Sequence, residues 1–269
     1  MTVREVYENV LRELRKTKAP AFHLEDFVYY SNKGIQEYVN LCYNVFQTSQ
    51  QSLDDLQALV IHATGTLNAN ETQIIFTDYT GNILHTTPVT RSKRYNSDCV
   101  IFTLPESYQH WLGAHAEIKN RRPLKCYPAG TTFVHPVKAL TSDIANQIMT
   151  NSYARPDAAF GRVFYMLGDS TVNNAIVKPS AQIFFGSAAT YGMGKVNVDF
   201  LKAPARINLT VQERDSPLDT SASLEFPEYV CNEIVKHIVK LTLEASSDPR
   251  LQNHIPINTT IPKNLTQAK

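Results

Sequence analysis

The longest amphipathic pattern in the chain covers residues 24–46 and predicts a single helix. Small or apolar side chains recur at alternating steps of four and three residues, which places them on one helical face: Leu24, Val28, Ser31, Ile35, Tyr38, Cys42 and Val45. At ~1.5 Å per residue this helix would be roughly 35 Å long. Gly34 lies in its middle, where glycine costs about 1 kcal/mol relative to alanine, so we expect a neighbouring backbone to approach closely there.

Two further helices are expected at the ends of the chain. Residues 3–16 carry Val6, Val10, Leu11 and Leu14 at helical spacing, and residues 227–245 carry Val230, Ile234, Ile238 and Leu241. Pro227 suits the first position of a helix, because proline has no backbone N–H to leave unpaired. A short helix starting at Ser52 completes the first sixty residues. We expect the terminal helices to pack together as one bundle.

From about Asn70 the hydrophobic period shortens towards two and turn residues multiply, which predicts strands. The first two, residues 72–79 and 82–87, form a hairpin across Thr80 and Gly81. Further strands are expected at residues 99–104, 124–127, 131–137, 164–167, 181–185, 195–201 and 205–211. Residues 106–119, which follow Pro105, and residues 142–151, capped by Thr141, are expected to be helical.

Together these patterns predict an α+β chain: a bundle of N- and C-terminal helices with a β-rich middle unit and an extended C-terminal tail. The expected parts are an N-terminal helical segment (1–60), a β-rich domain with a short internal helix pair (61–222), a C-terminal helix packing on the N-terminal helices (223–248) and the tail (249–269). With 269 residues, 43% of them hydrophobic, the chain can bury a sizeable core.

Charge is balanced overall but segregated along the sequence. The net charge of +1 argues against a protein that grips nucleic acid through a wholly basic surface. Residues 91–138 nevertheless hold eight Lys/Arg and three Asp/Glu, whereas residues 213–248 hold three Lys/Arg and eight Asp/Glu. Such asymmetry is typical of solvated surface, and it would also suit subunits that meet head to tail.

The head-to-tail alternative predicts specific ion pairs between neighbouring subunits. Cations of one subunit would face acidic residues of the next: Arg91, Lys93, Arg94, Lys119, Arg121, Arg122 or Lys125 against Glu225, Glu228 or Glu233.

Cysteine usage and the N-terminus indicate a cytoplasmic setting. Cys42, Cys99, Cys126 and Cys231 show no C-x-x-C spacing, which favours a reducing compartment. The first residues form a charged amphipathic pattern without an apolar signal core, and no run approaches the ~18 apolar residues of a membrane span. We therefore expect no membrane partner.

No motif points to catalysis, to a metal or to a cofactor. His110 and His115 are five residues apart, a poor spacing for two ligands on one helical face. Residues 191–194 hold two glycines without the rest of a phosphate-binding motif and are interpreted as a loop. Capping and helix-dipole effects explain Asp54 and Asp55. We expect no catalytic, cofactor-binding or metal-binding residues, no cofactor, and a protein that is not an enzyme.

Four segments resemble the ring proteins of crAss-like podoviruses. They are DFVYYSNKGIQEYVNLCYNVFQTSQQSLDDLQAL (26–59), ALTSDIANQIMTNSYARPDAAFGRVFY (139–165), NVDFLKAPARINLT (197–210) and EFPEYVCNEIVKHIVKLTLEASSDPRL (225–251). The resemblance implies a virion structural protein of the head-to-tail connector, assembled in the host cytoplasm. It implies a dodecameric ring below the portal vertex, an adaptor between portal and tail through which genomic DNA passes. Residues 61–138 and 168–179 have no counterpart in it.

The partners implied are the protein itself, the phage portal protein, other ring, tail or muzzle proteins, and genomic DNA held transiently in the channel. For contacts between subunits we predict Ile35, Tyr38, Cys42, Ile234, Ile238, Arg121, Arg122, Glu228 and Glu233. The extended tail would reach a neighbour through Ile255, Ile257, Ile261 and Leu265. The alternatives are a tail-associated enzyme such as a hydrolase and a DNA-binding module. Three observations would distinguish these functions. A ring protein would form a large closed oligomer, an enzyme would be active as a monomer, and a DNA-binding module would show salt-dependent DNA affinity.

Overall fold

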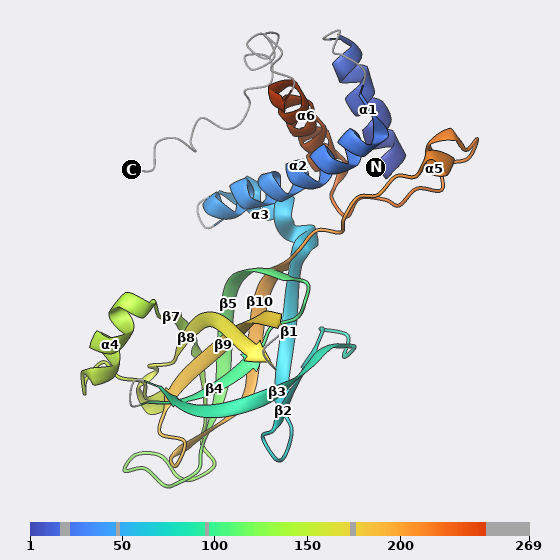
Figure 1. Ribbon diagram of the computed structural model, residues 1–269. Coiled ribbons are helices and arrows are strands. Elements are labelled where there is room, and N and C mark those ends of the chain that lie inside the picture. Colours follow the sequence, from blue (N-terminus) through green and yellow to red (C-terminus); the bar gives the residue numbers. More distant parts are fainter. Residues whose placement is uncertain (17–21, 47–48, 95–96, 173–175, 246–269) are drawn as a thin grey trace. The chain divides into compact units, whose positions relative to one another are not determined.

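The computed structural model describes residues 1–16, 22–46, 49–94, 97–172 and 176–245 (Figure 1). The chain divides into two compact units. Val60–Lys202 forms one, which we call the sheet unit, and the described residues of Met1–Leu59 and Ala203–Lys269 form the other, the helical unit. The predicted tail, residues 249–269, lies outside the described residues.

The sheet unit is built on a single ten-stranded sheet with the strand order β6-β5-β10-β1-β2-β3-β4-β9-β8-β7. Neighbouring strands are antiparallel except for β7 and β8, which run parallel. The strands are β1 (Val60–Leu67), β2 (Gln73–Thr77), β3 (Ile83–Arg94), β4 (Ser97–Thr103), β5 (Tyr108–Asn120), β6 (Thr132–Pro136), β7 (Lys138–Ala139), β8 (Phe164–Val172), β9 (Ile176–Gly186) and β10 (Tyr191–Lys202). A short helix, α4 (Ser142–Thr150), and a single turn, η2 (Ala158–Phe160), lie between β7 and β8.

One strand that changes partners, and one link between two strands, bend the sheet round on itself. β3 pairs with β2 as far as Pro88 and with β4 from Val89 onward. At the other side, Val137 joins β6 to β7, and its N–H donates to the carbonyl of Ala114 on β5 at 2.8 Å. The next residue, Lys138, donates to Val163 beside β8 at 2.9 Å. The two edges of the sheet are therefore brought together by one continuous stretch of chain.

Alternation along the strands fills the interior of this curled sheet with large aromatic side chains. Phe76 and Phe102 lie with their ring centroids 5.5 Å apart, and Trp111 stacks on Tyr165 at 4.6 Å. The outer face of β4, β8 and β9 is covered by α4, in a second cluster of Cys99, Leu140, Ala145, Met149, Met166 and Phe184. The strands that α4 covers are thus apolar on both faces.

The helical unit contains α1 (Val3–Lys16), α2 (Leu24–Val45), α3 (Gln50–Leu56), η1 (Gln57–Leu59), α5 (Val211–Asp215) and α6 (Glu228–Ala245). α6 packs against α1 and α2, and α3 packs against α2. A Cβ at Gly34 would lie 3.1 Å from Ile238 Cγ1, so the close neighbour of this glycine is a side chain of α6. The three atoms nearest to that Cβ all belong to side chains of α6, not to the backbone that the sequence led us to expect.

Residues 203–227, which we call the arm, run from the sheet unit to α6 and are tied to the helices by polar contacts. Asn32 on α2 donates from Nδ2 to the carbonyl of Ile207 and accepts from its N–H, both at 2.9 Å. Thr2, just before α1, forms a bridge with Ser223, and Val3 N–H donates to the carbonyl of Ala222 at 2.9 Å. Part of the arm is therefore fixed to the helices on which it lies.

The predicted fold class, an α+β chain organised around a bundle of N- and C-terminal helices, is wrong. The dominant element is the large, nearly closed ten-stranded sheet, and the chain contains the helices in addition to it. The largest local error is at residues 106–119, expected to be helical and found to be strand β5. The physical reason is an irregularity in the pairing of β5 with β10, where the register shifts between Gly113 and Trp111. It places the inward residues Trp111 and Ala114 three positions apart instead of two, and the next inward residues, Ala114 and Ala116, are too small to give a clear hydrophobic alternation.

Other strand predictions had mixed outcomes. The hairpin of residues 72–79 and 82–87 is confirmed by the pairing of β2 with β3. The strand expected at residues 205–211 is wrong, because this stretch is unpaired and ends in α5, where Thr210 and Glu213 form a reciprocal cap. Residues 124–127 form only an isolated bridge between Leu124 and Tyr127.

No helix in the described ranges combines the length and apolar character needed to cross a membrane.

The cysteines supply a first test of the structure. Cys42, Cys99 and Cys231 are buried, and burial raises the pKa of Cys42 and of Cys99 to about 11 and raises that of Cys231 as well. Because the thiolate is the reactive form, these three thiols should react very slowly at pH 8. Only Cys126 is exposed. A thiol reagent should therefore modify one group rapidly in the native protein and four after unfolding, and Cys126→Ser should remove the rapid phase. Two or more fast thiols in the native protein would contradict the packing described.

Candidate functional site

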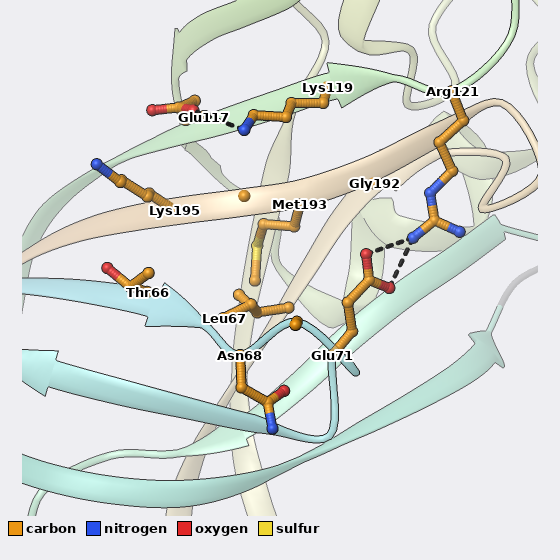
Figure 2. A pocket seen from close by; sticks show the side chains of 12 residues that line it. Thr66, Leu67, Asn68, Glu71, Glu117, Lys119, Arg121, Gly192, Met193 and Lys195 are labelled. Carbon is orange, nitrogen blue, oxygen red and sulfur yellow. Dashed lines mark hydrogen bonds and ion pairs between the residues drawn. The ribbon is translucent and has the colours of Figure 1, made fainter. Parts of the chain in front are cut away.

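A pocket of about 400 Å³ opens at one end of the sheet unit (Figure 2). It is formed by the end of β1, the turn from β1 to β2, the end of β5 and the start of β10. Its lining residues are Thr66, Leu67, Asn68, Ala69, Glu71, Glu117, Lys119, Arg121, Gly192, Met193, Gly194 and Lys195. Leu67 and Met193 supply the apolar part of the lining, and charged side chains of both signs surround them.

A β-bulge shapes the β10 side of this pocket. Met193 pairs with Ile118 and Lys195 pairs with Glu117, so Gly194 is an extra residue in β10 with no partner on β5. A bulge bends its strand and turns neighbouring side chains in new directions. Here Met193 is directed into the unit, where it is buried, while Lys195 two residues later is exposed.

The strongest electrostatic feature is the carboxylate of Glu71, which two arginines share. Arg121 donates from Nη2 to both carboxylate oxygens, at 2.5 and 2.6 Å, and Arg91 forms a second ion pair with the same group. Burial and the nearby charge of Arg121 lower the pKa of the Arg91 guanidinium. Gly192 permits this arrangement, because a Cβ there would lie 2.6 Å from Arg121 Nε. Figure 2 shows the Arg121 side chain pointing across the pocket to Glu71.

The backbone of Glu71 is also unusual. Its φ of 55° makes it the one residue other than glycine with a left-handed backbone in the described parts of the chain. The turn around it is held by Asn68, whose side-chain oxygen accepts from the N–H groups of Thr72 and Gln73 at 2.8 and 3.2 Å. Non-glycine residues in this region cost free energy and persist only where their surroundings hold them. Here the ion pairs with the two arginines and the hydrogen bonds of Asn68 hold Glu71 in this conformation.

The remaining charges leave the pocket open to an anionic partner. Glu117 is 4.0 Å from Lys119, at the limit of an ion pair. Lys195 is exposed and forms no ion pair within the described ranges. With Arg91 included, four cations and two carboxylates surround the pocket. This composition suits a ligand that combines a short aliphatic group with a carboxylate or phosphate.

The structure separates the residues that we predicted for subunit contacts into two groups. Ile35, Cys42, Ile234 and Ile238 are each 9% exposed or less, and they pack inside the helical unit of their own chain. The Tyr38 hydroxyl is likewise engaged within the unit, where it donates to the buried carboxylate of Asp55 at 2.9 Å.

The charged members of the set lie at or near the surface. Arg121 lines the pocket, and Arg122 follows it on an exposed turn. Glu228 is exposed at the start of α6, and Glu233 forms an ion pair with Lys236 at 2.8 Å. Ile255, Ile257, Ile261 and Leu265 of the tail lie outside the described residues.

Sequence reasoning missed most of the pocket. Residues 191–194 were interpreted as a loop, whereas they begin β10 and line the pocket. The paired glycines were the available signal, since they allow the close approach of Arg121 at Gly192 and the bulge at Gly194. Glu71 and Lys195 carried no local signal. His110 and His115, which we considered as metal ligands, both lie on β5, and burial lowers the pKa of His110. The described residues include no cluster of three or more His, Cys, Asp or Glu able to hold a metal ion.

Comparisons with known proteins give no direct guide to this site. No protein-family model matches the chain, and no curated protein sequence matches it.

Proposed function

We propose that this protein is a phage virion structural protein, one subunit of a ring in the connector between portal and tail. The resemblance of residues 26–59, 139–165, 197–210 and 225–251 to the ring proteins of crAss-like podoviruses suggests the class. In this proposal the protein assembles in the host cytoplasm as a dodecamer, contacts the portal and other tail components, and surrounds DNA in transit.

The observation that carries the proposal is the placement of opposite charges on two separate compact units. The sheet unit holds the cations of residues 91–125, among them the exposed Arg122 and Lys125. The helical unit holds the acidic stretch, including the exposed Glu225 and Glu228. A chain with unlike surfaces on its two units can pair with copies of itself head to tail, and repetition of one such contact closes a ring if the rotation between copies allows it.

The burial of Ile35, Ile234 and Ile238 changes which residues make the contact. These side chains stabilise the subunit itself, so in the proposal the contact between subunits falls to the exposed charges. An exposed ion pair contributes only about 0–1 kcal/mol, but each subunit of a ring makes two such contacts and each contact can hold several pairs. The assembly should therefore weaken as salt concentration rises.

Electron microscopy and particle-mass measurement on the purified protein, alone and with its portal, test the proposal. We expect a closed ring in at least one of the two samples, and fewer rings at high salt. Arg122→Glu with Lys125→Glu should reduce the fraction of rings, whereas Lys138→Glu, an exposed reversal on β7, should not. Arg121 is left unchanged in this test because it holds Glu71. A single-chain mass in both samples would exclude the ring, and steeply salt-dependent DNA affinity of that monomer would favour a DNA-binding module.

A further inference from the structure

The pocket of the sheet unit and one turn of the arm have matching chemistry. The pocket places Leu67 and Met193 beside Lys119 and Lys195. A partner that fits it needs one aliphatic side chain with negative charge on either side. The helical unit presents such a segment at residues 215–219, which begins at the last residue of α5 and continues into the loop before α6.

Residues 215–219, which we call the acidic turn, read Asp-Ser-Pro-Leu-Asp. Leu218 is 74% exposed, an unfavourable state for a leucine that nothing covers. Hydrogen bonds from Arg214 lower the pKa of Asp215, and those from Ser221 and Thr2 lower the pKa of Asp219. Both carboxylates therefore stay ionised at neutral pH. A carboxylate has about four acceptor positions, so each can still receive a further donor.

The acidic turn is held in place before any partner arrives. Arg4 on α1 donates from Nη1 to the carbonyl of Ser216 at 2.6 Å, and Thr2 donates from Oγ1 to Asp219 at 2.5 Å. Asp219 also accepts from the N–H and the hydroxyl of Ser221, at 3.0 and 2.6 Å. A segment fixed in this way loses little conformational entropy on binding. This combination of exposure and rigidity is what a docking segment requires.

We propose that the acidic turn of one copy docks into the pocket of the next copy. Leu218 lies against the half-buried Leu67, and the carboxylates of Asp215 and Asp219 face Lys119 and Lys195. This inference rests on the proposed head-to-tail ring and names the contact that builds it. The occupant is a second copy because the charge of the acidic turn is opposite to that of Lys119 and Lys195 in the pocket, and every copy carries one turn and one pocket.

The contact can be trapped as a disulfide between separately prepared copies. Both carry Cys126→Ser, which removes the exposed native thiol. One copy also carries Leu218→Cys. The other carries Ala69→Cys, a small exposed residue of the pocket lining whose replacement leaves Lys119, Lys195 and the apolar residues intact. Mixing and mild oxidation should give a cross-linked pair that contains one copy of each kind.

A matched control replaces Ala69→Cys with Tyr79→Cys. Tyr79 is 92% exposed, and it follows β2, whereas Ala69 precedes it. A cysteine there should react with free reagents as readily and should not cross-link to Leu218→Cys. Equal cross-linking of the two positions would show that the turn does not select the pocket, and would overturn the inference.

Assembly measurements without cysteines complete the test. Leu218→Ala should weaken self-association roughly tenfold or more, since burying a leucine side chain is worth more than one decade of affinity. Lys195→Glu should weaken it as well, while Tyr79→Ala should leave it unchanged. Because Leu218, Lys195 and Tyr79 are exposed, all three variants should fold.

The outcomes separate this contact from the ring itself. Wild-type rings that persist in Leu218→Ala and in Lys195→Glu, with no cross-link, would overturn the docking contact and leave the ring intact. A cross-linked pair without any closed ring would support the contact and exclude the ring. If Lys195→Glu lowers DNA affinity while self-association stays unchanged, the pocket binds nucleic acid and the inference fails.

Discussion

Replacing Ile234 with aspartate is expected to unfold the helical unit at 25 °C. Ile234 on α6 has no exposed surface in the subunit, and α6 packs against both α1 and α2. An aspartate there would bury a carboxylate without a partner, which costs several kcal/mol, and would also lose the packing of the isoleucine. Domains are stable by only about 5–15 kcal/mol, so the change removes a large share of the total. Helical circular dichroism should fall in water, or the urea midpoint should drop sharply.

Asn232→Asp is the matched control for this substitution. It introduces the same side chain two residues earlier on the same helix, at an exposed position. Its effect on the free energy of unfolding should stay within about 0.5 kcal/mol. Ile35→Asp on α2 should behave like Ile234→Asp, since Ile35 is only 2% exposed. An Ile234→Asp protein with the wild-type urea midpoint would show that α6 does not bury this face.

The long helices could be read from the sequence because their signal is local. The helix expected over residues 24–46 is found as α2 (Leu24–Val45), and α1 (Val3–Lys16) has the predicted bounds. Of the face predicted for α2 only Ser31, Ile35 and Cys42 are buried, and Phe27, Gly34 and Val39 complete the buried face. In a helix the residues that share a face are three and four positions apart, so the pattern is complete within one segment.

The closed sheet could not be read in this way because its register depends on distant partners. β1 was missed altogether, and its pairing joins Val60 to Leu201 and Thr66 to Lys195. Two inward positions of β1, Ala63 and Gly65, are too small to give a strong hydrophobic alternation. The partner changes that curl the sheet, at Val89 and Val137, likewise have no local signature. Long-range pairing of this kind is set by the whole fold.

The pocket shows the same limit at a smaller scale. Its lining residues come from three separate segments of the sequence, and its central ion pairs join Glu71 to arginines that follow it in the chain by twenty and fifty positions. The charge asymmetry was visible in the sequence, and the structure places its basic stretch in the sheet unit and its acidic stretch in the helical unit. Only the folded chain shows which cations are already neutralised by Glu71 and which remain for a partner.

Adding one methyl group at Gly65 should destabilise the sheet unit by about 1–3 kcal/mol. Gly65 faces the interior from β1, and a Cβ there would lie 2.6 Å from Cε1 of Phe76 and 2.7 Å from Cδ1 of Ile74. Both neighbours are 1% exposed or less and are packed on all sides, so neither can move away at low cost. Gly65→Ala is therefore an overpacking substitution, and urea unfolding followed by tryptophan fluorescence should report it through Trp111.

Gly113→Ala is the matched control, because a Cβ at Gly113 on β5 meets no atom within 4 Å. It should be neutral or stabilising by up to about 0.4–1 kcal/mol, since alanine narrows the unfolded ensemble. Shortening the obstructing ring separates crowding from other causes. Phe76→Leu is destabilising by itself, but combined with Gly65→Ala it should cost less than the sum of the two single changes, by about 0.5 kcal/mol or more. Strict additivity would mean that the ring of Phe76 does not exclude a side chain at position 65.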